Sequence, residues 1–177
     1  NTTPPTATPA PSSKKTSPLG QINLATLTKI IEFGDLKTYE HASGYFTIDV
    51  PENWTVNDAS TDSEAITYFL DPSKNALILA RVVVAPNEPD MDALGEMLQG
   101  YVETTFGKQK SYEAEDPKQM SSGDMMGMGF SFDAAQNGKT FRMFGDGFGF
   151  KDGLLASTLI FISPKDQYEK IKKQAYE

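Results

Sequence analysis

The chain has 177 residues, no cysteine and a formal net charge of −8, from 24 acidic and 16 basic residues. The length suits one domain of about 100–200 residues, and the charge argues against nucleic acid and anionic membrane surfaces as partners, since both are bound through clustered Lys and Arg. The lack of cysteine excludes thiol catalysis, Cys-ligated zinc and iron–sulfur clusters.

The start of the chain differs in composition from the rest. Residues 1–13 are all Asn, Thr, Pro, Ala or Ser, a composition that cannot bury a core and favours extended polyproline II. Such spacers commonly follow a lipidated cysteine in exported bacterial proteins. Residues 1–20 are therefore predicted to be an extracytoplasmic tether and residues 21–177 a single domain, with a signal peptide and a lipid anchor upstream of Asn1. The alternative is a cloning choice or a linker from a larger protein.

The first predicted elements are a segment that fits either a helix or a strand, followed by a strand. Residues 22–34 fit a helix or a strand, because apolar residues recur at helical spacing while the composition suits either. Residues 45–51 alternate apolar and polar side chains and predict a strand that ends at Pro51. Trp54 is expected to fold back over the end of this strand.

Two apolar runs then predict a β-hairpin. Residues 65–70 and 76–84 flank the turn-rich residues 71–75. The second run is apolar on both faces apart from Arg81, which is typical of a central strand covered on both sides.

Residues 90–106 predict a helix. Asp90 can cap it, and Gly107 is expected to end it in the left-handed conformation. One stripe along the helix is predicted to be buried: Met91, Leu94, Leu98, Tyr101 and Thr105.

Three strands follow, at residues 125–133, 140–150 and 154–162. In the first, Met and Phe alternate with Gly and Ser, so that one face carries large side chains and the other is bare. Asn137-Gly138 predicts the hairpin turn to the second strand, and Lys151-Asp152-Gly153 predicts the next turn.

The last predicted element is a helix. Ser163 is expected to cap it, with Pro164 at its first position and Asp166 returning a hydrogen bond; its predicted buried residues are Tyr168, Ile171 and Ala175. The order of strands, helix, strands and helix predicts an α+β fold in which helices cover an antiparallel sheet of about six strands. Both residues 45–50 and residues 154–162 are expected to belong to that one sheet.

Residues 44–54, Gly-Tyr-Phe-Thr-Ile-Asp-Val-Pro-Glu-Asn-Trp, resemble the opening of PsbP-like domains, in which a strand of the form G-F-x-I-x-x-P-x-x-W begins the sheet. The order of the later elements is similar to that superfamily over residues 36–177. The resemblance implies an α-β-α sandwich with a central antiparallel sheet, and a binding or assembly module that is not an enzyme. Many bacterial members are lipoproteins, and the resemblance transfers no functional residue.

Few residues suggest chemistry. His41, the one histidine, lies among polar residues and is interpreted as an exposed structural residue, since no G-x-S-x-G motif accompanies it. The acidic residues Asp90, Asp92, Asp146 and Asp152 lack the spacing of a calcium loop. We therefore expect no catalytic residue, no metal and no cofactor.

Candidate binding residues are Arg81 and a group on the strand at 140–150. If buried, Arg81 must be paired; it is interpreted as a strand-edge residue or as the partner of an acidic residue on a helix, with an anion or partner anchor as the alternative. One face of this strand lacks side chains at Gly145, Gly147 and Gly149. Another group, either a helix of the same chain or a ligand, can therefore approach its backbone closely. The predicted ligand- or partner-binding residues are Arg81, Arg142, Phe144, Asp146 and Phe148.

Two functional hypotheses follow. The first is a non-enzymatic binding or assembly module, tethered in the cell envelope or secreted, with an envelope protein as partner and a membrane contacted only through the lipid anchor. It predicts an exposed apolar or aromatic patch. The second is a small-molecule or lipid carrier, which predicts an apolar cavity of about 300–1,000 Å³ lined by the Met/Phe strands.

Overall fold

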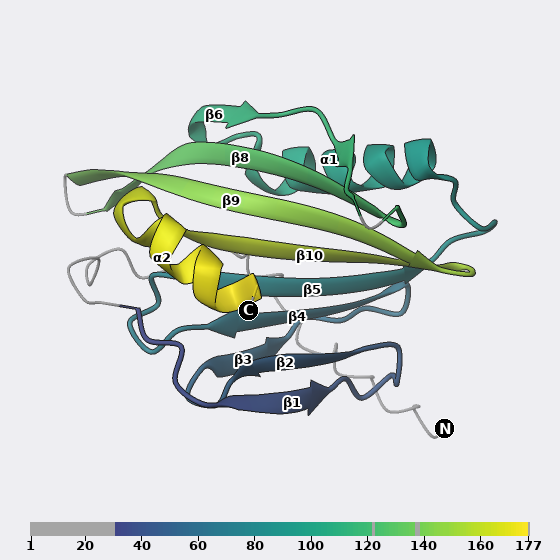
Figure 1. Ribbon diagram of the computed structural model, residues 1–177, viewed down its shortest axis with the longest axis horizontal. Coiled ribbons are helices and arrows are strands. Elements are labelled where there is room, and N and C mark those ends of the chain that lie inside the picture. The colour runs from purple at the N-terminus through teal and green to yellow at the C-terminus, as the bar shows by residue number, and fades with distance from the viewer. Residues whose placement is uncertain (1–30, 122, 137–138, 177) are drawn as a thin grey trace, which may run out of the picture.

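The computed structural model describes residues 31–121, 123–136 and 139–176, and the predicted tether lies outside them. Ten strands and two helices follow in chain order: β1 Leu36–Glu40, β2 Thr47–Pro51, β3 Thr55–Asp58, β4 Glu64–Leu70, β5 Leu77–Val84, α1 Met91–Phe106, β6 Lys110–Ala114, β7 Lys118–Gln119, β8 Met125–Gln136, β9 Lys139–Asp152, β10 Leu155–Pro164 and α2 Lys165–Tyr176 (Figure 1). Eight of the strands form one antiparallel sheet in the order β3-β4-β5-β10-β9-β8-β6, and β7 pairs with β8.

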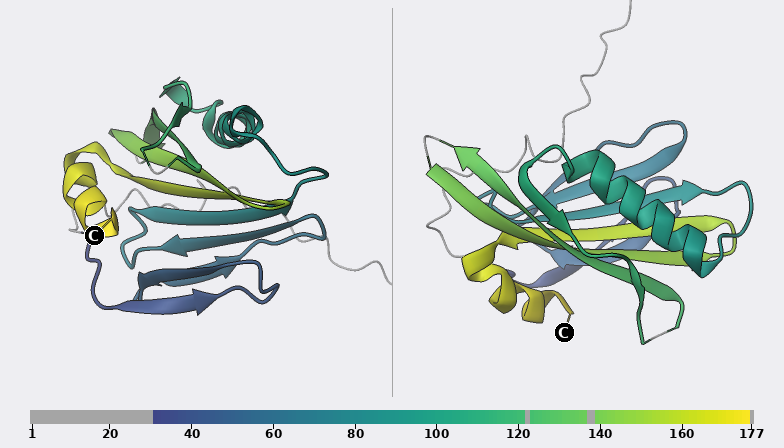
Figure 2. Two further views of the ribbon diagram at one scale, coloured as in Figure 1. Left: turned by 45° about the vertical axis from the view of Figure 1, so that its right-hand side comes forward. Right: turned by 90° about the horizontal axis from the view of Figure 1, so that it is seen from above.

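Elements pack on both faces of this sheet: α1 lies over one face, and α2 lies on the other side (Figure 2). An apolar cluster fills the space on each face. On the face that we call the α1 face, Leu94, Leu98 and Phe106 of α1 pack with the large side chains of β4, β5, β8 and β10. On the opposite face, which we call the α2 face, Ile171 of α2 and Val50 of the β1–β2 hairpin pack with those side chains of β4, β5 and β10 that point to this face. The sheet is therefore the middle layer of the fold.

The predicted sheet of about six strands is too small, and one of its strands is misplaced. Residues 47–51 form β2, which pairs with β1 in a separate two-stranded sheet instead of joining β10. The separation arises because β1 and β2 have one apolar face and pack that face onto the main sheet, with Tyr39, Phe46 and Ile48 in the same cluster as Phe69. The next strand, β3 from Thr55 to Asp58, joins the main sheet as an edge strand paired with β4.

The predicted hairpin of β4 and β5 is confirmed. Its turn is built on Asp71, whose carboxylate is 1% exposed. One carboxylate oxygen accepts hydrogen bonds from the backbone N–H groups of Asn75 and Ala76, and the other accepts from the N–H and the hydroxyl of Ser73. The side chain thus satisfies buried donors that the turn leaves without backbone partners.

The predicted helix over residues 90–106 is confirmed, with Asp90 as its N-cap: Oδ1 accepts from Ala93 N–H at 2.8 Å. The prediction for Gly107 is wrong. This glycine is right-handed, with φ −61° and ψ −16°, because its N–H still bonds to the Glu103 carbonyl. The buried stripe is also shifted by one residue at its end, to Leu94, Gly95, Leu98, Val102 and Phe106.

Removal of the N-cap tests the start of α1. Asp90→Ala is expected to lower the free energy of unfolding by about 1 kcal/mol, because Ala93 N–H loses its acceptor. Denaturant unfolding measures the loss. Asp92→Ala, one residue inside the exposed first turn, is the matched control and should cost less than half as much; equal losses in the two variants would contradict the assignment of the cap.

Glycines of β9 that have no side chain on the α1 face let α1 approach the sheet closely. Of the two groups expected to approach this face, a ligand or a helix of the same chain, the structure shows the helix. A Cβ on Gly147 would lie 3.1 Å from the Leu98 side chain, and a Cβ on Gly149 would lie 3.3 Å from Leu94. At Gly145 it would meet the Phe130 ring at 2.4 Å. The hairpin that joins β8 to β9 has the expected antiparallel register, and its turn Asn137-Gly138 lies outside the described residues.

The last helix begins later than predicted. Ser163 and Pro164 continue β10, opposite Phe144 and Met143, so Ser163 pairs in the sheet instead of capping α2. Of residues 22–34, the described residues 31–34 are neither helix nor strand. Neither α1 nor α2, the helices of the described residues, is long and apolar enough to cross a membrane.

Candidate functional site

The α2 face of β8 and β9 carries most of the predicted binding residues. Even-numbered residues of β9 point to this face, and they pair across the strands with Met125, Gly127, Gly129 and Ser131 of β8. Phe148 lies between Gly127 and Leu159 of β10, and Phe150 lies beside Met125. The sheet alternation thus places Phe144, Asp146 and Phe148 in a row.

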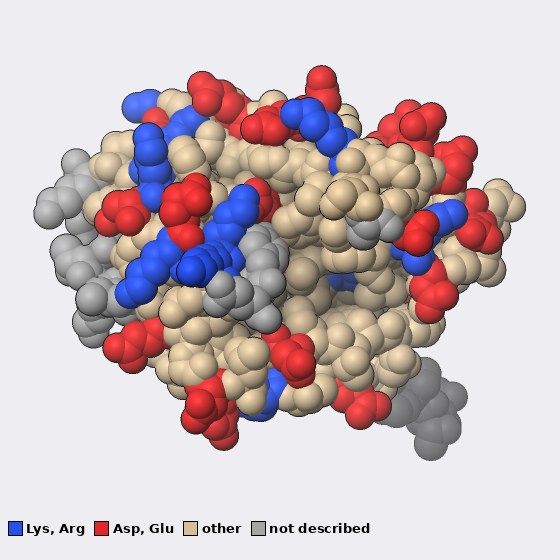
Figure 3. Space-filling view, in the orientation of Figure 1, with Lys and Arg blue, Asp and Glu red and all other residues tan. Residues whose placement is uncertain are grey.

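Two adjoining hollows lie on this face. The apolar hollow has a volume of about 470 Å³ and is lined chiefly by methionine, phenylalanine and leucine. The polar hollow has a volume of about 400 Å³ and continues toward α2. They share Glu115, Gly129, Asp146 and Lys172, so together they form one groove. Figure 3 shows the side of the molecule on which α2 lies, with a recess near its middle that is bordered largely by uncharged residues.

The apolar hollow lies on a part of the sheet that no helix or strand of the described residues covers. Residue Lys172 of α2 lines its inner end, and Met120, next to β7, forms its outer wall. Its apolar lining is Met120, Met125, Met128, Phe148, Phe150 and Leu159. Gly127 and Gly129 add no side chain to the floor, and the Met120 sulfur lies 2.7 Å from where a Gly127 Cβ would be. Methionine is flexible and polarizable, so this wall can adapt to different apolar groups.

An ion pair divides the groove. Asp146 Oδ2 lies 3.0 Å from Lys172 Nζ, and the two side chains are 12% and 40% exposed. Lys172 also lies over the Tyr168 ring, which in turn makes an edge contact with Phe144 at 5.5 Å. The predicted residues Phe144 and Asp146 therefore line the polar hollow, while Phe148 lines the apolar one.

Arg142 lies on the same face but outside both hollows. Its guanidinium donates to the Ser111 carbonyl at 2.7 Å and to the Ser131 hydroxyl at 2.6 Å, and it pairs with Glu113 at 2.7 Å. A hydrogen bond from Ser111, together with the Arg142 guanidinium, lowers the pKa of Asp133. Arg142 thus clamps β6 to β8 and β9.

Arg81 is not brought to this face. It lies on the α1 face, where Nε donates to Glu64 at 2.8 Å and the guanidinium stacks over the Tyr101 ring at 4.4 Å. Its neighbours match the interpretation as an ion pair, although the acid belongs to a strand, and they place Arg81 under α1, away from the groove.

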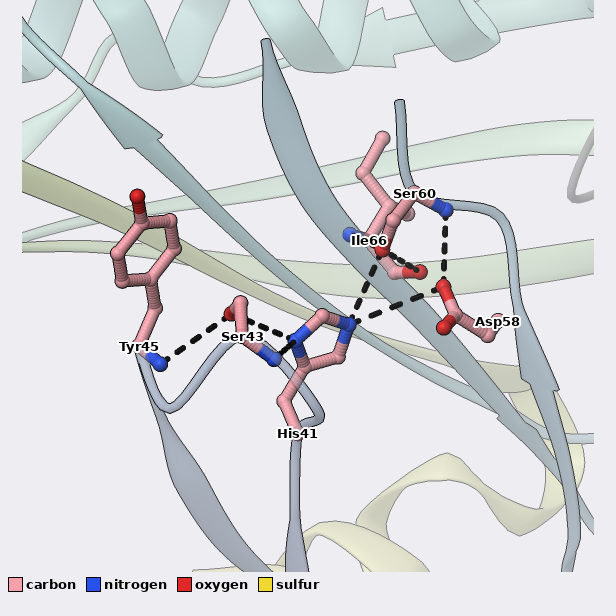
Figure 4. A network of polar contacts seen from close by, with 6 residues as sticks. All are labelled: His41, Ser43, Tyr45, Asp58, Ser60 and Ile66. Carbon is pink, nitrogen blue, oxygen red and sulfur yellow. Dashed lines mark hydrogen bonds and ion pairs between the residues drawn. The ribbon is translucent and has the colours of Figure 1, made fainter. Parts of the chain in front are cut away.

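The prediction that His41 is exposed is wrong: it is 4% exposed and stacks on Phe46. Figure 4 shows its polar contacts with Ser43, Ser60 and Asp58. Ser43 N–H donates to Nδ1 at 3.1 Å, which places the ring proton on Nε2, 3.0 Å from the Ser60 hydroxyl. Asp58 lies 3.7 Å from the same nitrogen, Nε2. On the other side of the ring, Ser43 Oγ lies 2.7 Å from Nδ1. Ser60 Oγ also accepts a hydrogen bond from Ile66 N–H at 3.0 Å. The network therefore fastens the turn after β1 to the start of β4.

The remaining acidic candidates have structural neighbours. Asp90 caps α1 and Asp146 pairs with Lys172. Among the described residues, no group of three or more histidine or acidic side chains is arranged to hold a metal ion.

Sequence reasoning missed most of the groove lining. Lys118 belongs to β7, Met120 follows that strand, Leu159 belongs to β10 and Lys172 to α2, so no local pattern links the four. One signal was present: the bare face of β8 at Gly127 and Gly129. It predicted an open strand face without indicating that part of it stays uncovered.

The fold has a solved counterpart. The structure matches the solution structure of cyanobacterial PsbP (CyanoP) from Synechocystis sp. PCC 6803 with a TM-score of 0.53 and 11% sequence identity, over 81% of this chain and 88% of that chain. The chain therefore has a PsbP-like fold, as the resemblance at residues 44–54 predicted, with a larger central sheet. No protein-family model matches the sequence. A comparison with curated proteins finds no match either.

Proposed function

We propose that this protein is a non-enzymatic binding or assembly module that acts outside the cytoplasm, and that the groove on the α2 face contacts its partner protein. The observation that carries the proposal is the Met/Phe wall of the groove, which no described helix or strand covers, on a sheet that is otherwise packed on both faces. Met120 and Phe150 are each 36% exposed there. Exposed apolar side chains gathered beside a hollow mark interaction sites.

Two further features support a binding role. The PsbP-like fold is shared with CyanoP, and the resemblance stated above implies binding or assembly modules for that superfamily. In addition, His41, Arg81 and Asp90 each have hydrogen-bond partners that hold the fold together. The Thr/Pro-rich residues 1–13 support an envelope location on a tether.

Site-specific photo-cross-linking in the cells that make the protein tests the proposal. A photoreactive phenylalanine analogue at Phe150 is expected to give a discrete cross-linked product with an envelope protein. The same analogue at Glu96, on the exposed side of α1, is the control and should give none. Identical products from both positions, or no product from Phe150, would refute the groove as the contact surface.

A small-molecule or lipid carrier is the second candidate, because the apolar hollow of about 470 Å³ falls within the range of ligand sites. The hollow is an open groove. As a carrier, the protein purified from its native envelope should bring a bound apolar compound in stoichiometric amount, detectable by native mass spectrometry. Protein that is free of ligand would exclude this candidate.

A further inference from the structure

The groove has an apolar end and an acidic end. The polar hollow is lined by four carboxylates and one basic side chain, Lys172; the carboxylates are those of Glu113, Glu115, Asp146 and Glu169. Glu113 pairs with Arg142 at 2.7 Å and Glu115 with Lys118 at 3.5 Å, so four carboxylates face three cations and acidic charge is in excess by one. At the shared part of the groove, Glu115 and Asp146 are present in both linings. A ligand that fills the apolar hollow and extends toward α2 therefore meets negative charge.

The two partners of the central ion pair differ in how easily they can move. Asp146 is 8% exposed and is fixed on β9, in the interior of the sheet. The Lys172 side chain is 40% exposed and has a long flexible stem, so its ammonium can turn into water at small cost. A cation that enters the groove can replace Lys172 at Asp146. An anion would instead lie beside a buried carboxylate, which is unfavourable.

We propose that the groove binds an extended segment of the partner protein, with a bulky apolar side chain in the apolar hollow and a Lys or Arg side chain beside Asp146. This inference rests on the proposed function and adds the chemistry of the partner. The two hollows adjoin and share four lining residues. The apolar side chain and the basic side chain of the bound segment therefore lie one or two residues apart, since an extended chain rises about 3.3 Å per residue. Two hollows in line suit a chain better than one compact molecule.

Peptide titration of the full chain tests the inference. The probe is acetyl-Phe-Gly-Lys-Gly-amide, followed by amide NMR shifts of Gly127 and Gly129, with the exposed Gly100 of α1 as the reference. The peptide is expected to shift the two groove glycines and to bind about tenfold more tightly than its twin with Glu in place of Lys, a difference typical of one charge-assisted contact. A third peptide with Ser in place of Phe should bind about tenfold more weakly as well.

Two lysine variants separate ligand exchange from a purely structural role of the ion pair. Lys172→Gln removes the competing cation and is expected to tighten binding of the Lys peptide by about threefold to tenfold. Lys170→Gln, on an exposed position of α2 outside the groove lining, is the matched control and should change nothing.

Three results would overturn the inference: equal or tighter binding of the Glu peptide, weaker binding of the Lys peptide to Lys172→Gln, or no shift of Gly127 and Gly129 with any peptide. These results leave the proposed function standing if cross-linking from Phe150 still captures an envelope protein. Loss of that cross-link, in contrast, refutes the proposed function itself.

Discussion

Phe106→Ala is expected to lower the free energy of unfolding by about 3–5 kcal/mol, and the melting temperature by roughly 10 °C. The Phe106 side chain is fully buried at the end of α1. Its ring stacks on Phe130 at 5.1 Å and on Phe132 at 5.6 Å, so truncation removes apolar burial and leaves a cavity between α1 and β8. Urea unfolding followed by circular dichroism measures the loss.

Phe150→Ala is the matched control for Phe106→Ala. Its ring is 36% exposed in the wall of the groove, so the same truncation should cost no more than about 1 kcal/mol. The two variants therefore separate packing from binding: Phe106→Ala should destabilise the fold, and Phe150→Ala should weaken the partner contact. Similar stability losses in both would show that Phe150 is part of the packed core.

Asp71→Ala is the second change with a large expected effect, a loss of about 3–5 kcal/mol in the free energy of unfolding. Its carboxylate accepts four hydrogen bonds in the turn between β4 and β5, including those from the backbone N–H groups of Asn75 and Ala76. Asn75 and Ala76 are fully buried, so water cannot readily replace the lost acceptor. Chemical denaturation again gives the value.

Asp62→Ala provides the comparison for Asp71→Ala. Asp62 lies in the exposed turn before β4, and its removal should change stability by less than about 0.5 kcal/mol. Asp71→Asn should recover part of the loss, since the amide oxygen can still accept hydrogen bonds. A loss below about 1 kcal/mol for Asp71→Ala would mean that the turn has other acceptors for these donors.

Local patterns predicted the elements whose side chains repeat with a clear period. Residues 90–106 have helical spacing and a capping Asp90, and β8, β9 and β10 alternate or are continuously apolar, so each was recognisable alone. The turn at residues 71–75 was predictable because Asp, Pro, Ser and Asn favour turns for local reasons.

The unpredicted strands lack such a pattern. β1, β3, β6 and β7 are all short. β3, β6 and β7 also lie at or near the edges of the main sheet, where one side of the strand needs no partner and polar residues are tolerated. The pairing of β2 with β1 was also unpredictable, because alternation shows that a strand has an apolar face without showing which sheet it joins. Only contacts distant in sequence decide that choice.

The candidate site could be predicted in part. Phe144, Asp146 and Phe148 share one face of β9 because strand alternation requires it. Arg142 shares that face, but its guanidinium is hydrogen-bonded to residues of β6 and β8. Arg81 points to the opposite face of the sheet. The burial of His41 depends on Ser60 and Phe46, which the fold and not the local sequence brings to it.

Gly129→Leu in the photo-cross-linking experiment is the most direct test that the groove binds the partner. Gly129 lines both hollows, and a Cβ there would have only the Glu115 carboxyl as a neighbour, at 3.6 Å. The leucine side chain should therefore fill the groove without disturbing the core. We predict that the melting temperature is unchanged within about 2 °C and that the cross-link from Phe150 disappears. A cross-link that persists at full yield in this stable variant would contradict the account.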